Sequence, residues 1–121
     1  MMQYLALIYE TEETRSKLSQ TQQDALYDEY RKLIAELGGK LIGANRLRPA
    51  STASTIRVRD GKRLVTDGPF AETKEYLGGY FLIEAADLDE AIQIASRIPA
   101  ARMDCVEIRA VVPREQAVAR S

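Results

Sequence analysis

The chain of 121 residues has no histidine and a single cysteine, Cys105. Without histidine the commonest general base and zinc ligand is missing, so acid–base chemistry falls to carboxylates, lysine or tyrosine. We therefore predict no metal site and no cofactor, and the missing axial histidine also argues against a haem enzyme. One cysteine excludes an intrachain disulfide bond.

Long apolar runs are also missing. No stretch is long enough to span a bilayer and no cleavable leader precedes Gln3, so we expect a cytoplasmic protein without a membrane partner. A chain of this length with 45% hydrophobic residues suits one domain with one core. We predict a single domain over residues 1–113 and a polar C-terminal tail over residues 114–121.

Charge is nearly balanced overall, at −1, but it is distributed unevenly. Residues 46–63 carry six basic side chains against Asp60, whereas residues 64–90 carry seven acidic side chains against Lys74. The basic block is short and no recognition-helix pattern accompanies it, so we expect no nucleic-acid partner. The two blocks either pair on a solvated surface or form a cleft with a basic wall for an anionic ligand.

The first half of the chain predicts a strand, a helix and a strand. Residues 4–9 are a short apolar run with aromatic ends, which is typical of a buried strand. Ser19 and Gln22 fit a capping box, and the helix that follows ends at Gly38-Gly39. A second strand is predicted from Leu41 toward Leu47. The apolar face of the helix consists of Leu26, Tyr30, Leu33, Ile34 and Leu37.

The second half predicts a hairpin, a central strand, a helix and a last strand over residues 106–112. Asp60-Gly61 fits a type I′ turn, and residues 80–85 are apolar on both faces. Asp87 caps the second helix, which Pro99 stops. Its predicted buried face consists of Leu88, Ala91, Ile92, Ala95 and Ile98.

This order predicts an α+β fold, a ferredoxin-like βαββαβ sheet with an added hairpin and both helices on one face. The strands at residues 4–9 and 80–85 are apolar on both faces, while two helices can cover only one. We therefore predict a homodimer in which two sheets pack face to face.

The segment Asp67-Gly68-Pro69-Phe70-Ala71-Glu72-Thr73-Lys74-Glu75, preceded by Leu64-Val65-Thr66 and followed by Gly78-Gly79-Tyr80, resembles the signature of YCII-related proteins of the DGPF type. The closing Val106-Glu107-Ile108-Arg109 fits the same pattern. The resemblance implies a small cytoplasmic dimeric α+β barrel, often encoded beside an alternative sigma factor, with an active-site cleft and no generally assigned reaction. Better-studied relatives resemble muconolactone-isomerase-like proteins and use a His/Asp pair, tied to a dehydrochlorinase activity. The position of that histidine falls near Asp28 here, so a carboxylate mechanism around Asp67 would replace it.

Asp67 and Lys74 are the predicted catalytic pair. A buried Asp67 carboxylate could act as a base while Lys74 stabilises negative charge on the substrate. The structural alternatives are that Asp67 caps the Asp-Gly-Pro turn and that Lys74 belongs to a local ion-pair cluster with Glu72 and Glu75.

The predicted ligand-binding residues are Arg57, Arg59, Thr73, Glu75, Tyr9 and Asp28, with Tyr27 beside them. Arg57 and Arg59 alternate with Ile56 and Val58, so they should point away from the helices, toward solvent or the dimer side of the sheet. There they could bind a carboxylate or phosphate.

Three further positions have mainly structural interpretations. Phe70 is expected to anchor the loop on the core, with ligand stacking as the alternative. Gly78 and Gly79 are expected to mark a bulge or a close backbone approach, and the same freedom could admit a ligand. Cys105 has no basic neighbour in sequence and is expected to be an inert thiol.

Two functions remain open from the sequence. One is an enzyme of the isomerase or lyase type that acts on a small anionic molecule near the Asp67–Phe70 loop. The other is a non-catalytic ligand-binding or regulatory dimer linked to an alternative sigma factor.

Overall fold

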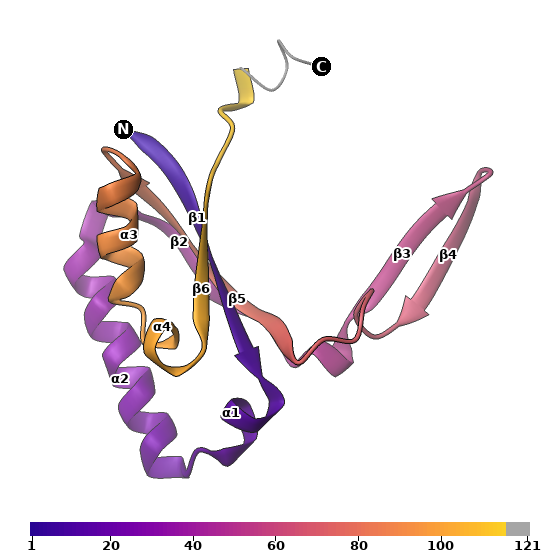
Figure 1. The fold of residues 1–121 in the computed structure, drawn as a ribbon, viewed down its shortest axis with the longest axis horizontal. Coiled ribbons are helices and arrows are strands. Elements are labelled where there is room, and N and C mark those ends of the chain that lie inside the picture. Colours follow the sequence, from indigo (N-terminus) through magenta and orange to yellow (C-terminus); the bar gives the residue numbers. More distant parts are fainter. Residues whose placement is uncertain (116–121) are drawn as a thin grey trace.

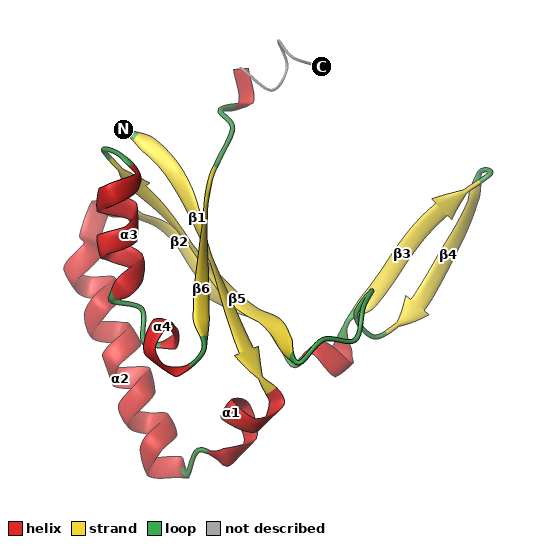
Figure 2. Cartoon of the chain, in the orientation of Figure 1, coloured by secondary structure: helices red, strands yellow, loops and turns green. Residues whose placement is uncertain are grey.

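The computed structural model describes residues 1–115. Its main sheet is antiparallel, with the strand order β2-β5-β1-β6. Both long helices cover the same face of this sheet (Figure 2). This α+β arrangement is compatible with the predicted ferredoxin-like fold. The elements are β1 (Met2–Thr11), α2 (Gln20–Leu37), β2 (Leu41–Arg46), β5 (Glu75–Ala85), α3 (Leu88–Ser96) and β6 (Cys105–Ala110).

Two short helices and two 3₁₀ turns were not predicted. Helix α1 (Glu12–Lys17) is capped by the Thr11 side chain, which accepts from the Thr14 amide, and α4 (Ala100–Met103) follows Pro99. The Thr14 hydroxyl donates to Asp104 Oδ1 at 3.1 Å, which ties the first turn of α1 to the residue that follows α4. The 3₁₀ turns are η1 (Gly38–Lys40) and η2 (Ala50–Thr52).

The predicted helix caps are confirmed. Ser19 and Gln22 form the capping box of α2, and Asp87 accepts from the Glu90 amide at the start of α3. The predicted buried face of α3 is partly wrong, because Leu88 and Ile92 are exposed and Ile94 is buried instead. Positions 91, 94, 95 and 98 face the sheet, where two alanines let the helix lie close to the strands.

Alternate side chains of the two central strands build the core with the helices. Ile83 is fully buried in β5, where it lies opposite Tyr4 of β1. The remaining core residues are Ala6, Ile8, Leu33, Leu37, Phe81, Ala85, Ala91, Ile94, Ala95, Ile98 and Ala100. The Tyr30 and Phe81 rings pack with centroids 6.1 Å apart.

The intervening side chains of the same strands lie on the other face of the sheet, which we call the open face. Leu5 pairs with Leu82, and Leu7 pairs with Tyr80, so these apolar side chains form one cross-strand cluster. They are half-buried, and none of the helices in residues 1–115 covers them (Figure 1). The prediction of apolar side chains on both faces is confirmed.

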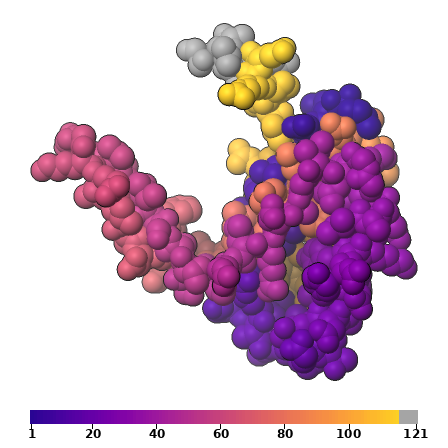
Figure 3. All heavy atoms as spheres, turned by 180° about the vertical axis from the view of Figure 1, so that it is seen from behind, coloured from indigo at the N-terminus to yellow at the C-terminus, as the bar shows by residue number. Residues whose placement is uncertain are grey.

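The added hairpin does not extend the main sheet. Strands β3 (Ser54–Arg59) and β4 (Lys62–Asp67) pair only with each other and form a separate two-stranded sheet, which we call the arm. The arm projects from the rest of the chain, which we call the body (Figure 1; Figure 3). Its turn has φ of 54° at Asp60 and 74° at Gly61, as the type I′ prediction requires.

The arm side chains follow the prediction in part. Arg57 and Arg59 alternate with Ile56 and Val58 and are exposed to solvent, as expected, but Ile56 and Val58 are exposed as well, because the arm stands away from the helices. A strand pattern fixes which side chains share a face and leaves open what that face packs against.

The loop after the arm also departs from prediction. Gly68 has φ of 94°, as an Asp-Gly-Pro turn suggests, and its amide donates to the Ala53 carbonyl at 2.6 Å. Phe70, the predicted anchor, is 80% exposed, so it does not anchor the loop on the core formed by the described residues. Of the predicted polar tail, residues 116–121 lie outside the described residues.

Candidate functional site

A cavity of about 530 Å³ opens between α2 and the main sheet, and we call it the helix-side cavity. It lies at the end of the sheet where β1 runs into α1, and α4 closes its far side. A volume of this order suits a small-molecule ligand. Its apolar walls come from Ile8, Leu26, Ile34, Phe81 and Met103.

Glu10 and Arg15 bring charge to this cavity. Arg15 Nη1 donates to Glu10 Oε1 at 2.5 Å and Nη2 donates to the Leu47 carbonyl at 2.9 Å. The two side chains are only 19% and 17% exposed. An ion pair this shielded from water is stronger than a surface pair, so it holds the carboxylate in a fixed place.

Arg46 and Asp104 complete the charged lining. Asp104 is held by the Thr14 hydroxyl, whereas no ion pair involves Arg46 within residues 1–115. Arg46 is therefore the cation of the lining that is available to an anion.

Tyr30 adds a hydroxyl to the same lining. Burial raises the pKa of the Tyr30 phenol, and the negative charge of Glu10 acts in the same direction. The phenol therefore stays protonated at neutral pH and can donate a hydrogen bond to a bound anion.

The glycine pair Gly78-Gly79 shapes the floor of the cavity. The β1–β5 register shifts at Ile8/Tyr9 so that Gly78 forms a bulge. A Cβ added at Gly78 would lie 2.6 Å from the Glu10 carboxylate, and one at Gly79 would lie 2.8 Å from the Asn45 carbonyl oxygen. Both predicted roles, bulge and close backbone approach, are confirmed, and Gly78 leaves the space that Glu10 fills.

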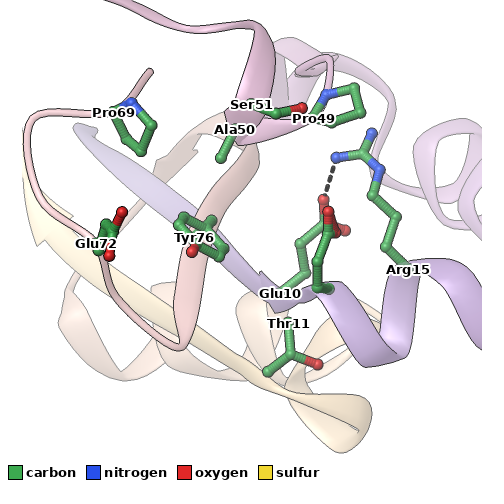
Figure 4. Close-up of a pocket in the computed structure, with 10 residues that line it drawn as sticks. Glu10, Thr11, Arg15, Pro49, Ala50, Ser51, Pro69, Glu72 and Tyr76 are labelled. Atoms are coloured by element: carbon green, nitrogen blue, oxygen red, sulfur yellow. Dashed lines mark hydrogen bonds and ion pairs between the residues drawn. The ribbon is translucent and has the colours of Figure 1, made fainter. Parts of the chain in front are cut away.

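A second, smaller hollow of about 170 Å³ lies beside the signature loop, and we call it the loop-side cavity. Glu10 and Arg15 line it as well, so their ion pair separates the two cavities. Figure 4 shows Pro69 and Glu72 of the loop on one side, Tyr76 between them and the pair, and Arg15 bonded to Glu10. The signature segment thus reaches the site through Pro69 and Glu72.

Comparison with known families matches residues 2–115 to the YCII-related domain. The chain belongs to the YCII-related family. It is also 40% identical over 98 residues to an uncharacterized protein of Rhizobium meliloti (strain 1021), an alignment that covers 78% of this chain and 77% of the relative. Membership of this family agrees with the α+β fold but does not identify a reaction.

In this YCII-related chain the two predicted catalytic residues lie away from both cavities. Asp67 is exposed at the end of β4, where it pairs with Ser54, and Lys74 is exposed just before β5. Neither lines the helix-side or the loop-side cavity. The local ion-pair alternative for Lys74 is also not seen among residues 1–115.

The predicted ligand-binding residues are scattered. Arg57 and Arg59 lie on the arm, Asp28 is exposed on α2, and Tyr9 is half-buried on β1. The Thr73 hydroxyl donates to the Glu75 carbonyl at 2.5 Å. None of these six residues lines either cavity, while Tyr27 lines the helix-side cavity.

Cys105 and Glu75 do come together. The Cys105 thiol donates to Glu75 Oε2 at 3.0 Å, and this hydrogen bond raises the pKa of the thiol to about 11. A thiol that stays protonated at neutral pH is a poor nucleophile, which agrees with the predicted inert role.

Glu10, Arg15, Arg46 and Tyr30 were not predicted as site residues. Glu10 and Arg46 could have been recognised by their position in the sequence. Each is a charged residue at the end of a strand, and each lies next to the end of β5 that carries the glycine bulge. Only the register of β1, β2 and β5 brings those strand ends together.

The described part of the chain has neither a metal-binding cluster nor a membrane-spanning helix. Residues 1–115 contain no group of three or more histidine, cysteine or acidic side chains placed to hold a metal ion. Among these residues, every helix is too short or too polar to cross a membrane.

Proposed function

We propose that this YCII-related protein binds a small molecule with an apolar body and an anionic group in the helix-side cavity, where Glu10 transfers a proton in a reaction of the isomerase or lyase type. The observation that carries the proposal is the placement of Glu10. Its carboxylate fills the space left by Gly78 and is held by Arg15 at the boundary of both cavities.

The lining fits the proposed ligand. Arg46 and the Tyr30 hydroxyl offer a cation and a hydrogen-bond donor for a carboxylate or similar anion. The apolar walls match a hydrocarbon or aromatic body, and few polar groups among apolar ones are typical of ligand sites.

The chemistry follows from these groups. Glu10 takes a proton from a carbon beside the anionic or carbonyl group of the ligand, and the electron pair of the broken C–H bond moves onto that group's oxygen. Arg46 stabilises the oxygen charge. Return of the proton to a different carbon gives an isomer, whereas departure of a group from the neighbouring carbon gives a lyase product.

The signature residues remain predictions. The roles of Asp67 as a base and of Lys74 in stabilising negative charge are supported by the family resemblance and by charge. The same holds for the binding roles of Arg57, Arg59, Thr73, Glu75, Tyr9 and Asp28. We also propose that the chain forms a homodimer through the open faces of two main sheets, which is supported by their uncovered Leu5, Leu7, Tyr80 and Leu82.

A ligand screen followed by hydrogen exchange tests the function. Aliphatic and aromatic carboxylates are screened by thermal shift, and those that raise the melting temperature are incubated with protein in D₂O. We expect deuterium to replace a carbon-bound hydrogen of the ligand, as followed by proton NMR. Glu10→Gln should abolish this exchange, and Arg46→Ala should weaken ligand binding about tenfold.

Two variants control the experiment. Glu13→Gln removes a neighbouring exposed carboxylate that lines neither cavity, and it should exchange the ligand normally. Asp67→Asn decides between the two carboxylates, because loss of exchange in this variant with retention in Glu10→Gln moves the base to Asp67. Binding without exchange in the wild-type protein would mean a non-catalytic binding or regulatory protein.

A further inference from the structure

The arm has one apolar and one basic face. Ile56 pairs with Val65 and Val58 pairs with Arg63, so Ile56, Val58 and Val65 share a face, with Arg63 at its end near the turn. Arg57 and Arg59 lie on the other face, where they pair with Leu64 and Lys62. The three apolar side chains of the first face are each more than half exposed.

An arm of this kind is not stable alone in water. An isolated two-stranded hairpin is marginal, and independent stability needs a third strand or a packed face. The strands of the arm pair with no strand of the main sheet. The apolar face of the arm therefore needs a cover that residues 1–115 of the same chain do not supply.

The open face of the main sheet is also apolar and left uncovered by the helices. It stands at an angle to the arm. The helices lie on one side of the sheet, and the arm leaves toward the opposite side (Figure 1). The arm and the open face thus form a concave elbow. A body seated in the elbow would contact both surfaces at once.

We propose that a second copy of this chain occupies the elbow, with the apolar face of each arm packed on the body of the other copy. This inference rests on the homodimer proposed above and adds the arm to its interface. A twofold dimer satisfies both needs together, because each chain supplies one arm and receives one.

Charge supports a second copy as the occupant. Between residues 54 and 67 the arm carries Arg57, Arg59, Lys62 and Arg63 against Asp60 and Asp67, a net charge of +2. The whole chain has −1, so the rest of it has −3. A basic arm and an acidic body attract when they belong to different copies.

Interface area supports the same arrangement. A four-stranded face about six residues long measures about 20 Å by 19 Å, roughly half of the ~800 Å² per partner in a stable interface. An arm adds a strip of about 20 Å by 10 Å, and each partner both gives and receives one. Together these surfaces come to about the required area.

The test compares two arm variants by sedimentation equilibrium. Ile56→Ser with Val65→Ser removes the apolar face, and Leu64→Ser removes a similarly exposed side chain from the basic face. We expect a wild-type dimer, a dissociation constant at least about tenfold higher for the double variant, and little change for Leu64→Ser. Far-UV circular dichroism checks that both variants keep a folded body.

The outcomes separate the arm from the dimer. A monomeric wild-type protein at micromolar concentration overturns both proposals. A dimer that neither variant weakens overturns the arm proposal alone and leaves the sheet-to-sheet dimer standing. Amide hydrogen exchange gives a second readout: amides of β3 and β4 should be protected at high protein concentration and exchange rapidly on dilution.

Discussion

The body and the arm both contain antiparallel strands, and isoleucines in these strands reach different states. Ile83 of β5 has an apolar neighbour, Leu82, and is fully buried, whereas Ile56 of β3 alternates with Thr55 and Arg57 and is 63% exposed. In the body each central strand has a strand on both sides and helices above. In the arm each strand has a single neighbour and no layer above, so alternation specifies a strand without specifying its cover.

The largest difference between body and arm is expected for a matched pair of isoleucine truncations. Ile83→Ala should lower the free energy of unfolding by about 3 kcal/mol, because it leaves a cavity in the packed core. Ile56→Ala in the monomer should lower it by less than about 0.5 kcal/mol, because the side chain is already in water. Urea unfolding at low protein concentration measures both. Equal losses would mean that the arm packs within its own chain.

Glycine substitutions should also destabilise the body more than the arm, by smaller amounts. Gly79→Ala in the body should cost about 1–3 kcal/mol, because the new Cβ would lie 2.8 Å from the Asn45 carbonyl oxygen. Gly78→Ala should cost less, because the flexible Glu10 side chain can move aside, although the ligand site would be disturbed. In the arm Gly61→Ala acts only through its positive φ, so it should leave the unfolding of the body unchanged.

Gly43→Ala is the control for these variants. Gly43 lies in β2 of the same sheet, and an added Cβ there has no heavy atom within 4 Å. Its unfolding free energy should stay near that of the wild-type protein. A loss as large as that of Gly79→Ala would show that intrinsic glycine propensity, and not close contact, sets the cost.

The smallest expected effect concerns the reactivity of Cys105, which lies beside Glu75 where the arm loop joins the body. Glu75 is the first residue of β5 after the arm loop, and its hydrogen bond raises the pKa of Cys105 to about 11. A raised folded-state pKa stabilises the fold below the unfolded value of the thiol, near 9, and this contribution is lost as pH rises through 11. Glu75→Gln should therefore speed alkylation of Cys105 at pH 9 by up to about tenfold. An unchanged rate would remove Glu75 as the cause.

Much of the body could be predicted because its signals are local. Ser19 and Asp87 accept hydrogen bonds from amides three residues later, and Gln22 accepts one from the amide three residues earlier. Asp60-Gly61 forms its turn through its own φ angles. The buried face of α3 was harder to predict, since Leu88 and Ile92 fit the helical spacing of apolar residues as well as Ile94 does. Which of the two faces is buried depends on contact with the sheet.

The candidate site could not be predicted in the same way. The signature segment predicted Asp67 and Lys74 as site residues, whereas Glu10 and Arg15 line both cavities and Arg46 lines the helix-side cavity. A bulge at Gly78 was predicted, but Glu10, which fills the space beside it, lies 68 positions earlier in the chain. Strand pairing over such separations leaves no local pattern.

The amino-acid sequence was enough to predict the family, the α+β class, the order of the main elements, and the absence of histidine chemistry. Those properties follow from residue type and from periodicity within single elements. The tertiary structure alone decided that the hairpin is a separate arm, that Phe70 is exposed, and that Glu10 meets Arg15 beside Gly78. The physical reason is that cavities and uncovered faces depend on how elements pack, and packing joins residues that are distant along the chain.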